Sequence, residues 1–382
     1  MASLKNFAPQ PSFDAGRDPV IDIARGSAML LVIFGHTLLI FFLARPDGGF
    51  DPHAFSAAQA IQSFHMPAFY FISGMAALRL HERNFYQTAS QALTLIFFAY
   101  ITHLMAVPFV GAAHGDLLHP LNLIKLAVRP LVLGKDFALM VPWFLISLAI
   151  VQCLAWIYLR GSAIVKISMI IGLAAIFIAD ANGLKVIFMD NTWGIGLFFF
   201  LVGRAFSGVK KPAITPRLAA VAASVTIGLV TILHPLNKGC PLDPISNCNQ
   251  STYPSFGVNI VAGQVGFLPL FLVTAFLGIA SLILLAQAVK PFRASVLLVW
   301  IGQNTLSLLI LNGAFLVLAT PVLAAHISLR PWAWLVWSML ITAGHVAVLP
   351  FIKPGMDRLQ NLCRLAGDGV IHIAQKHFPE RI

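Results

Sequence analysis

One histidine inside a strongly apolar segment is the first candidate for chemistry in this sequence. His36 lies midway along the apolar run 26–44, and Arg25 precedes it by eleven residues, where the run begins. If the run is helical, eleven steps of about 100° bring both side chains to within about 20° of one face, roughly 16 Å apart along the axis. Asp18 and Asp22 extend this stripe, and Asp22 can pair with Arg25 at i,i+3.

An imidazole in such a segment suits proton transfer, because its pKa lies near neutral pH. The structural alternative is a histidine that only hydrogen-bonds a neighbouring helix, which is common where helices pack in a membrane. The alignment of His36 with Arg25 on one stripe favours a functional role.

A second polar group follows in residues 64–83. His65 and Ser73 lie in the segment 64–74, and Arg79 and Arg83 follow at i and i+4. Guanidinium groups match the oxygen geometry of phosphates, so the two arginines can bind an anionic ligand. Each residue also has a structural interpretation: His65 as an interfacial residue, Ser73 as part of a small-residue packing patch, and the arginines as cytoplasmic anchors.

The elements that position these residues must lie in lipid. Of 382 residues, 58% are hydrophobic and 10% are charged, and the mean hydropathy is +0.84. A soluble domain carries roughly 25% charged residues, so this chain cannot cover itself with a water-compatible surface. Its net charge of +11 is explained by basic cytoplasmic loops and requires no nucleic acid partner.

The fold class predicted is an all-α integral membrane protein, a bundle of about ten transmembrane helices. Each apolar run is long enough for a hydrocarbon core of roughly 30 Å. The runs are 26–44, 61–80, 86–110, 139–159, 163–181, 190–206, 217–235, 263–289, 294–319 and 331–351. No boundary divides the chain, so residues 1–382 form one membrane domain with short tails at both ends.

The charge distribution sets the orientation. With the N-terminus in the cytoplasm, 18 of the 25 Lys and Arg residues fall in cytoplasmic segments, which places both termini inside. The longest outer loops are then about 45–60, 111–138 and 236–262. Cys240 and Cys248 share the last loop and can form a disulfide if that face is oxidising. The histidines lack the spacing of a zinc site, so no metal is predicted.

The polar residues, taken together, resemble the signatures of the acyltransferase-3 family of membrane-bound acyltransferases. This family includes O-acetylases of bacterial polysaccharides and fucose 4-O-acetylase-like proteins. The resemblance covers about residues 17–355. Its motifs here are Arg17, Asp22, Arg25-Gly26 and His36; Phe64-His65-Met66-Pro67, Phe69 and Ser73-Gly74; Arg79 and Arg83; Trp143-Phe144-Leu145; and Gly302-Gln303-Asn304-Thr305-Leu306.

Two positions depart from the pattern of the family. The segment 97–100 reads Phe-Phe-Ala-Tyr, where a proline is expected, and Asn312 stands where relatives often carry histidine. If that histidine helps to bind substrate in relatives, Asn312 changes its role here. The assignment of His36 is not affected.

The resemblance implies transfer of an acyl group, acetyl or succinyl, from acyl-CoA to a hydroxyl of a carbohydrate or cell-surface polysaccharide. It implies a bacterial inner-membrane protein that acts beside the polysaccharide-biosynthesis machinery, with acyl-CoA as co-substrate and no tightly bound cofactor. The implied site residues are, for catalysis, His36, Arg25 and Asp22; for acyl-CoA, Arg79 and Arg83; and for substrate, His65, Ser73, Trp143, Asn304 and Asn312. The alternatives are a transporter or flippase with His36 and Arg25 lining the path, and a ligand sensor without turnover.

Overall fold

The computed structural model describes residues 18–41, 51–113, 115, 119–181, 187–209, 214–237, 258–327, 330 and 332–377. Every regular element in these ranges is a helix, apart from one isolated β-bridge between Asn259 and Gln264. The prediction of an all-α protein is therefore confirmed. The Cys240–Cys248 disulfide falls outside the described residues.

The α-helices are numbered in their order along the chain. They are α1 (Pro19–Thr37), α2 (Pro52–Gln62), α3 (His65–Ala76), α4 (Phe85–Ala113), α5 (Pro120–Leu133), α6 (Trp143–Arg160), α7 (Ala163–Ala181), α8 (Trp193–Ser207), α9 (Pro216–Leu233), α10 (Leu268–Val289), α11 (Ala294–Gln303), α12 (Thr305–Ala314), α13 (Thr320–Ala324) and α14 (Ala333–His377). Two single-turn 3₁₀ helices also matter for the site, η5 (Asp190–Thr192) and η7 (Ile260–Ala262).

Among the described residues, seven helical segments are long and apolar enough to cross a membrane, so several membrane-spanning helices are present, but the expected total of about ten is not confirmed. The seven are Pro19–Phe41, Phe85–Ala113, Trp143–Arg160, Pro216–Leu236, Leu268–Val289, Thr305–Ala324 and Ala333–His377. The other predicted spans correspond to α3, α7 and α8, which are not among the seven.

Two of the predicted runs are broken by polar or non-helical residues. The run 61–80 is divided between α2 and α3 at Phe64, whose φ of −141° leaves the helical range. The run 294–319 is divided between α11 and α12 at Asn304, whose side-chain Nδ2 donates to the carbonyl of Trp300 (2.7 Å). The breaks bring short helices, and their ends, into the centre of the molecule.

Two other segments are more helical than the sequence patterns indicated. The predicted outer loop 111–138 contains α5, which starts at Pro120 and ends before Gly134, a residue with φ of 64°. The last predicted span, 331–351, continues as α14 to His377 instead of ending in a tail. With 45 residues, α14 is about 68 Å long, more than twice the thickness of a hydrocarbon core.

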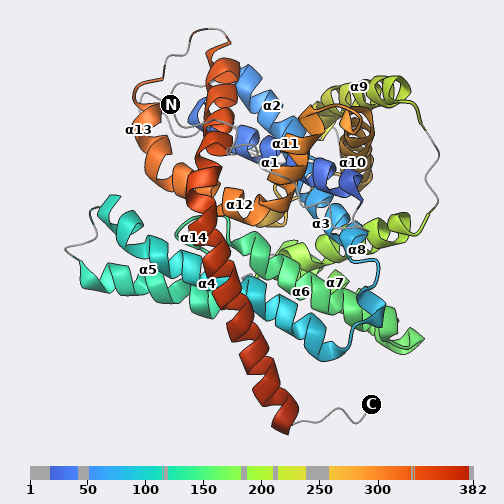
Figure 1. Cartoon of the computed structure of the whole chain (residues 1–382), viewed down its shortest axis with the longest axis vertical. Coiled ribbons are helices and arrows are strands. Elements are labelled where there is room, and N and C mark those ends of the chain that lie inside the picture. Colours follow the sequence, from blue (N-terminus) through green and yellow to red (C-terminus); the bar gives the residue numbers. More distant parts are fainter. Residues whose placement is uncertain are drawn as a thin grey trace.

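Helix α14 crosses nearly the whole length of the molecule and links its two groups of helices (Figure 1). Helices α4–α8 lie in the lower half of this view, and α1, α2 and α9–α13 lie in the upper half. The C-terminal half of α14 packs on the start of α4, where a Cβ on Gly367 would meet the Ser90 carbonyl oxygen at 3.1 Å.

Close backbone contact fixes α1 in the upper group. A Cβ on Gly26 would come within 2.2 Å of the Leu298 carbonyl oxygen in α11, and a Cβ on Gly302 within 2.0 Å of the Asp22 carbonyl oxygen. Only glycine permits such an approach. Because α12 follows α11 directly, this packing also sets the distance between α12 and the His36 side chain.

Candidate active site

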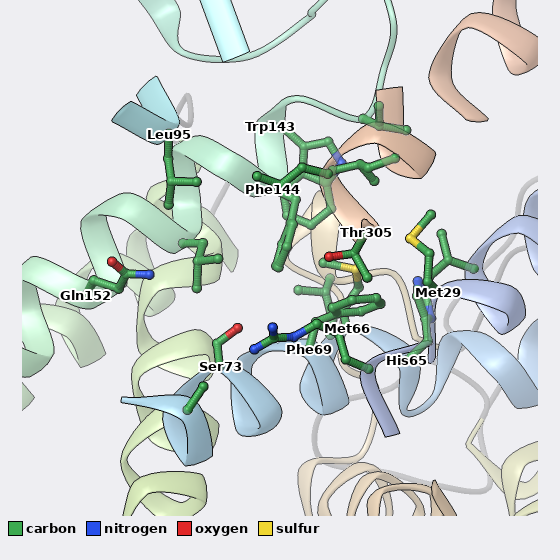
Figure 2. Close-up of a pocket in the computed structure, with 18 of the residues that line it drawn as sticks. Met29, His65, Met66, Phe69, Ser73, Leu95, Trp143, Phe144, Gln152 and Thr305 are labelled. Atoms are coloured by element: carbon green, nitrogen blue, oxygen red, sulfur yellow. The ribbon is translucent and has the colours of Figure 1, made fainter. Parts of the chain in front are cut away.

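A cavity of about 370 Å³ lies between the two groups of helices. Its walls come from α1, α3, α4, α6, α12 and η7. In Figure 2, Trp143 and Phe144 from the start of α6 face Met66 and Phe69 of α3 across the cavity. Leu95 and Gln152 lie toward one side of this view, and Met29 and His65 toward the other. The lining is mainly apolar, with few polar groups, as in most sites for small molecules.

His36 lines this cavity and has one fixed hydrogen-bond partner. Its Nδ1 lies 2.6 Å from Oδ1 of Asn312 in α12. An amide oxygen can only accept, so Nδ1–H is the donor and the lone pair of the neutral imidazole is on Nε2. Asn312 is fully buried and does not line the cavity. The arrangement leaves His36 with one basic nitrogen that is not used by Asn312.

Arg25 lines the same cavity, while Asp22 lies behind it. The i,i+3 pairing expected from the sequence is present, with Oδ1 of Asp22 3.9 Å from Nη1 of Arg25. The Asp22 side chain is buried, and the Arg25 side chain is 19% exposed. Asp18 has a structural role, because its carboxylate caps α1 by accepting from the Val20 amide (3.0 Å). The Arg25 guanidinium therefore faces the cavity, and the buried Asp22 carboxylate holds it in place.

Two further histidines lie in helices that pack against α1, His65 in α3 and His345 in α14. His65 lines the cavity and donates from Nδ1 to the Ile61 carbonyl (2.9 Å). His345 of α14 donates from Nδ1 to the Ile341 carbonyl (2.8 Å), and it does not line the cavity. His65 is thus a second imidazole available to a molecule in the cavity.

A second cavity, of about 840 Å³, adjoins the first. Four residues line both cavities, namely Arg83, Gln91, Leu95 and Gln152. Three arginines line the second cavity: Arg79 and Arg83, from the connection between α3 and α4, and Arg364 from α14. Glu82 and Asp368 also contribute to its walls, and the Asp368 carboxylate accepts from the Ser90 hydroxyl (2.5 Å). This cavity forms a basic mouth that leads to the His36 cavity.

The backbone and side chain of Arg83 are held from two directions. The Trp156 indole Nε1 donates to the Arg83 carbonyl (2.8 Å), and Arg83 Nη1 donates to Gln91 Oε1 (2.5 Å). The Trp156 ring in turn lies 4.9 Å below the Arg160 guanidinium. Arg83 is therefore positioned where the two cavities meet.

The other residues proposed from the sequence are placed in different ways. Ser73 and Trp143 line the His36 cavity. Asn304 does not: its amide caps the break between α11 and α12, and the next residue, Thr305, lines the cavity instead. Asn312 contacts His36 instead of the open space. The motif Gly302–Leu306 thus contributes Thr305 to the cavity wall, and not Asn304 as expected.

Sequence reasoning missed several polar residues of the two cavities, among them Gln91, Gln152, Arg364 and Asp368. The two glutamines lie within predicted apolar runs. A polar residue inside such a run is unusual, and that was the signal that could have identified them. Arg364 and Asp368 had no such signal, because they belong to a segment that was expected to be a tail. Within the described residues, no three His, Cys, Asp or Glu side chains gather as a metal site would require.

Comparison with known proteins identifies the chain at the level of a family. The model of the acyltransferase-3 family, described as an acyltransferase domain, matches residues 18–349. The match includes His36, Arg25, Asp22, Arg79, Arg83 and Asn312, and it ends before Arg364. Comparisons with curated proteins and with solved structures return no match.

Proposed function

We propose that this chain, which belongs to the acyltransferase-3 family and is a membrane acyltransferase, moves an acyl group from acyl-CoA to a hydroxyl of a carbohydrate. The observation that supports this most is the connection of the two cavities. One contains an imidazole with a basic nitrogen, and the other presents three arginines to a polyanion.

The donor binds with its phosphates in the basic mouth. Arg79, Arg83 and Arg364 supply guanidinium groups, which bind phosphate oxygens in a forked geometry. The acyl arm then enters the apolar cavity beyond Gln91 and Gln152, toward His36. The burial of the arm among apolar side chains excludes water from the thioester.

His36 is the general base. The acceptor hydroxyl oxygen attacks the thioester carbonyl carbon while Nε2 of His36 takes the hydroxyl proton. The tetrahedral intermediate collapses, the carbon–sulfur bond breaks, and the CoA thiolate leaves and receives the proton from His36. The products are the ester and free CoA. Asn312 is a positioning residue in this step, because its bond to Nδ1 keeps the lone pair on Nε2.

Arg25 acts away from the reacting carbon. It lies roughly 16 Å from His36 along the axis of α1, so its side chain meets the donor nearer the basic mouth. Asp22 holds Arg25 by the buried ion pair. His65 and Ser73 line the route of the acyl arm and contact bound substrate.

The acyl group is acetyl or succinyl, and the acceptor is a cell-surface carbohydrate. The bacterial inner membrane, with both termini in the cytoplasm, gives the basic mouth access to cytoplasmic acyl-CoA. The protein then works beside the machinery that makes the polysaccharide. A transporter with His36 and Arg25 along its path is the second candidate, because connected cavities also suit permeation.

Deletion of the chain in its host tests the proposed function. We expect the surface polysaccharides of the deletion strain to lose an ester that mass spectrometry detects in the parent strain, and the mass difference to name the acyl group. Complementation with the intact chain restores the ester. An unchanged ester content in the deletion strain would contradict the proposal.

A further inference from the structure

A third cavity adjoins the His36 cavity. It measures about 410 Å³, within the range of pockets that hold small molecules. Two residues, Trp143 and Val261, line both this cavity and the His36 cavity. Its lining is Lys135, Asp136, Phe137, Met140, Trp143, Met189, Asn191 and Val261.

The geometry of α6 separates the third cavity from the basic mouth. Trp143 is the first residue of α6, and Gln152, which lines the mouth, follows nine residues later. Nine residues of α-helix span about 14 Å. A molecule that enters through the third cavity therefore meets the His36 cavity at the end opposite to the arginines.

The backbone around this cavity is strained. Among the described residues, five other than glycine have positive φ, and four of these lie at or beside the cavity: Asp136, Met140, Phe188 and Met189. Such conformations cost energy and persist where the surroundings enforce them, often at functional sites. Because these strained residues lie together at one rim, we interpret the backbone conformation there as one that the function of the cavity requires.

Hydrogen bonds hold this rim in place. The Phe188 amide donates to the Leu133 carbonyl (2.7 Å), and the Trp193 indole donates to the Phe188 carbonyl (3.0 Å). The Thr192 hydroxyl donates to the Met189 carbonyl (2.7 Å). On the other side, the Ala138 amide donates to Nδ1 of His103 (3.0 Å). The rim is therefore fixed to α4, α5 and α8.

The polar groups of the rim suit a ligand with several hydroxyls. Asn191 is 3% exposed and donates from Nδ2 to the Val261 carbonyl (3.0 Å), while its Oδ1 accepts no hydrogen bond from the described residues. Lys135 adds donors, and Asp136, which pairs with Arg129 (2.9 Å), adds an acceptor. The Trp143 indole provides a flat apolar wall. Donors, acceptors and an aromatic face together match a sugar ring.

We infer that this third cavity is the acceptor site, through which a carbohydrate hydroxyl reaches His36 from the face opposite to the acyl-CoA mouth. The inference rests on the proposed function and adds the residues that bind the acceptor, Lys135, Asp136 and Asn191. Donor and acceptor then approach the imidazole from opposite ends of one row of cavities. Neither substrate has to leave before the other can bind.

The test uses the host deletion strain complemented with Lys135→Met, Asp136→Asn and Asn191→Leu. Asparagine also tolerates positive φ, so Asp136→Asn preserves the backbone. We expect each variant to lower the ester content of the surface polysaccharide by roughly tenfold at equal protein abundance. Lys135→Met and Asn191→Leu each lose a hydrogen bond to the acceptor, and Asp136→Asn replaces a hydrogen bond to a charged group by a weaker neutral one. In calorimetry, the purified variants should bind CoA with the same affinity as the intact protein.

Lys125→Met is the matched control, since Lys125 is exposed on α5 and lines none of the three cavities. It should keep the ester content of the intact chain. Because Lys135 and Asp136 are not fully buried, their variants report binding even if Asn191→Leu fails to fold. Ester content within twofold of the intact chain in either of these variants would overturn the acceptor site. Absence of any ester with the intact chain would instead overturn the proposed function.

Discussion

The hydrogen bond between His36 and Asn312 joins residues 276 positions apart. The sequence singled out both residues, but it gave no indication that they touch, because the contact depends on how α12 packs beside α1. The contact explains what asparagine does at position 312, where relatives often carry histidine. Its amide oxygen accepts a hydrogen bond from Nδ1–H of His36 and so fixes the tautomer of the base.

Replacement of Asn312 by leucine tests this role at the scale of one residue. Leucine has a similar size but cannot accept a hydrogen bond from Nδ1–H, so His36 can adopt the wrong tautomer. We expect kcat to fall on the order of 10²-fold, less than the roughly 10⁴-fold cost of a wrong tautomer in serine proteases. Single-turnover acyl transfer and CoA affinity should be measured together.

The expected pattern is a lower kcat with unchanged CoA affinity. A protein that loses CoA binding and kcat in parallel would show that Asn312 supports the fold instead of the base.

At the scale of elements, the sequence predicted where the apolar runs lie better than where the helices end. The segment 111–138 was predicted as an outer loop, although Pro120 and Gly134 are ordinary signals for the start and end of a helix such as α5. The last predicted span ended at residue 351, yet α14 continues to His377 with Pro350 and Pro354 inside it. Packing of α14 on α4 outweighs the cost of these prolines.

The extended α14 leads to a prediction about donor binding. Arg364 lies beyond the region matched by the family and yet lines the mouth with Arg79 and Arg83. We expect Arg364→Ala, like Arg79→Ala and Arg83→Ala, to weaken CoA binding on the order of 10–100-fold, the worth of hydrogen bonds to a charged group. Arg358→Ala, at an exposed position of the same helix that lines none of the three cavities, is the control.

Isothermal titration of the purified variants with CoA measures the effect. If Arg364→Ala and Arg358→Ala bind CoA equally well, the C-terminal half of α14 only packs against α4. If Arg79→Ala and Arg83→Ala also bind normally, these arginines are anchors at the membrane boundary.

At the scale of the whole molecule, the three cavities form a row through the bundle. The predicted orientation places the arginine mouth on the cytoplasmic face and the Lys135 rim on the outer face. This orientation is a prediction from charge statistics alone, because Lys and Arg are retained in cytoplasmic loops. The row itself depends on residues from distant segments, so no local pattern predicts it.

Topology is tested by a reporter fused after Arg381 that is active only in the cytoplasm. We expect activity there, and a second reporter that is active only outside should be silent. The opposite result would place the arginine mouth away from cytoplasmic acyl-CoA, and donor binding would need another site.

The most direct test of the account is acyl transfer by His36→Gln in membranes that contain wild-type amounts of protein. Glutamine can hydrogen-bond but cannot accept a proton at neutral pH. We therefore predict a loss of about 10²–10⁴-fold in rate, the usual contribution of a general base, for both His36→Gln and His36→Ala. The same substitution at the exposed His372 should leave the rate unchanged. Activity of His36→Gln within a few-fold of wild type, or a greater loss in His65→Gln, would contradict the assignment of His36 as the base.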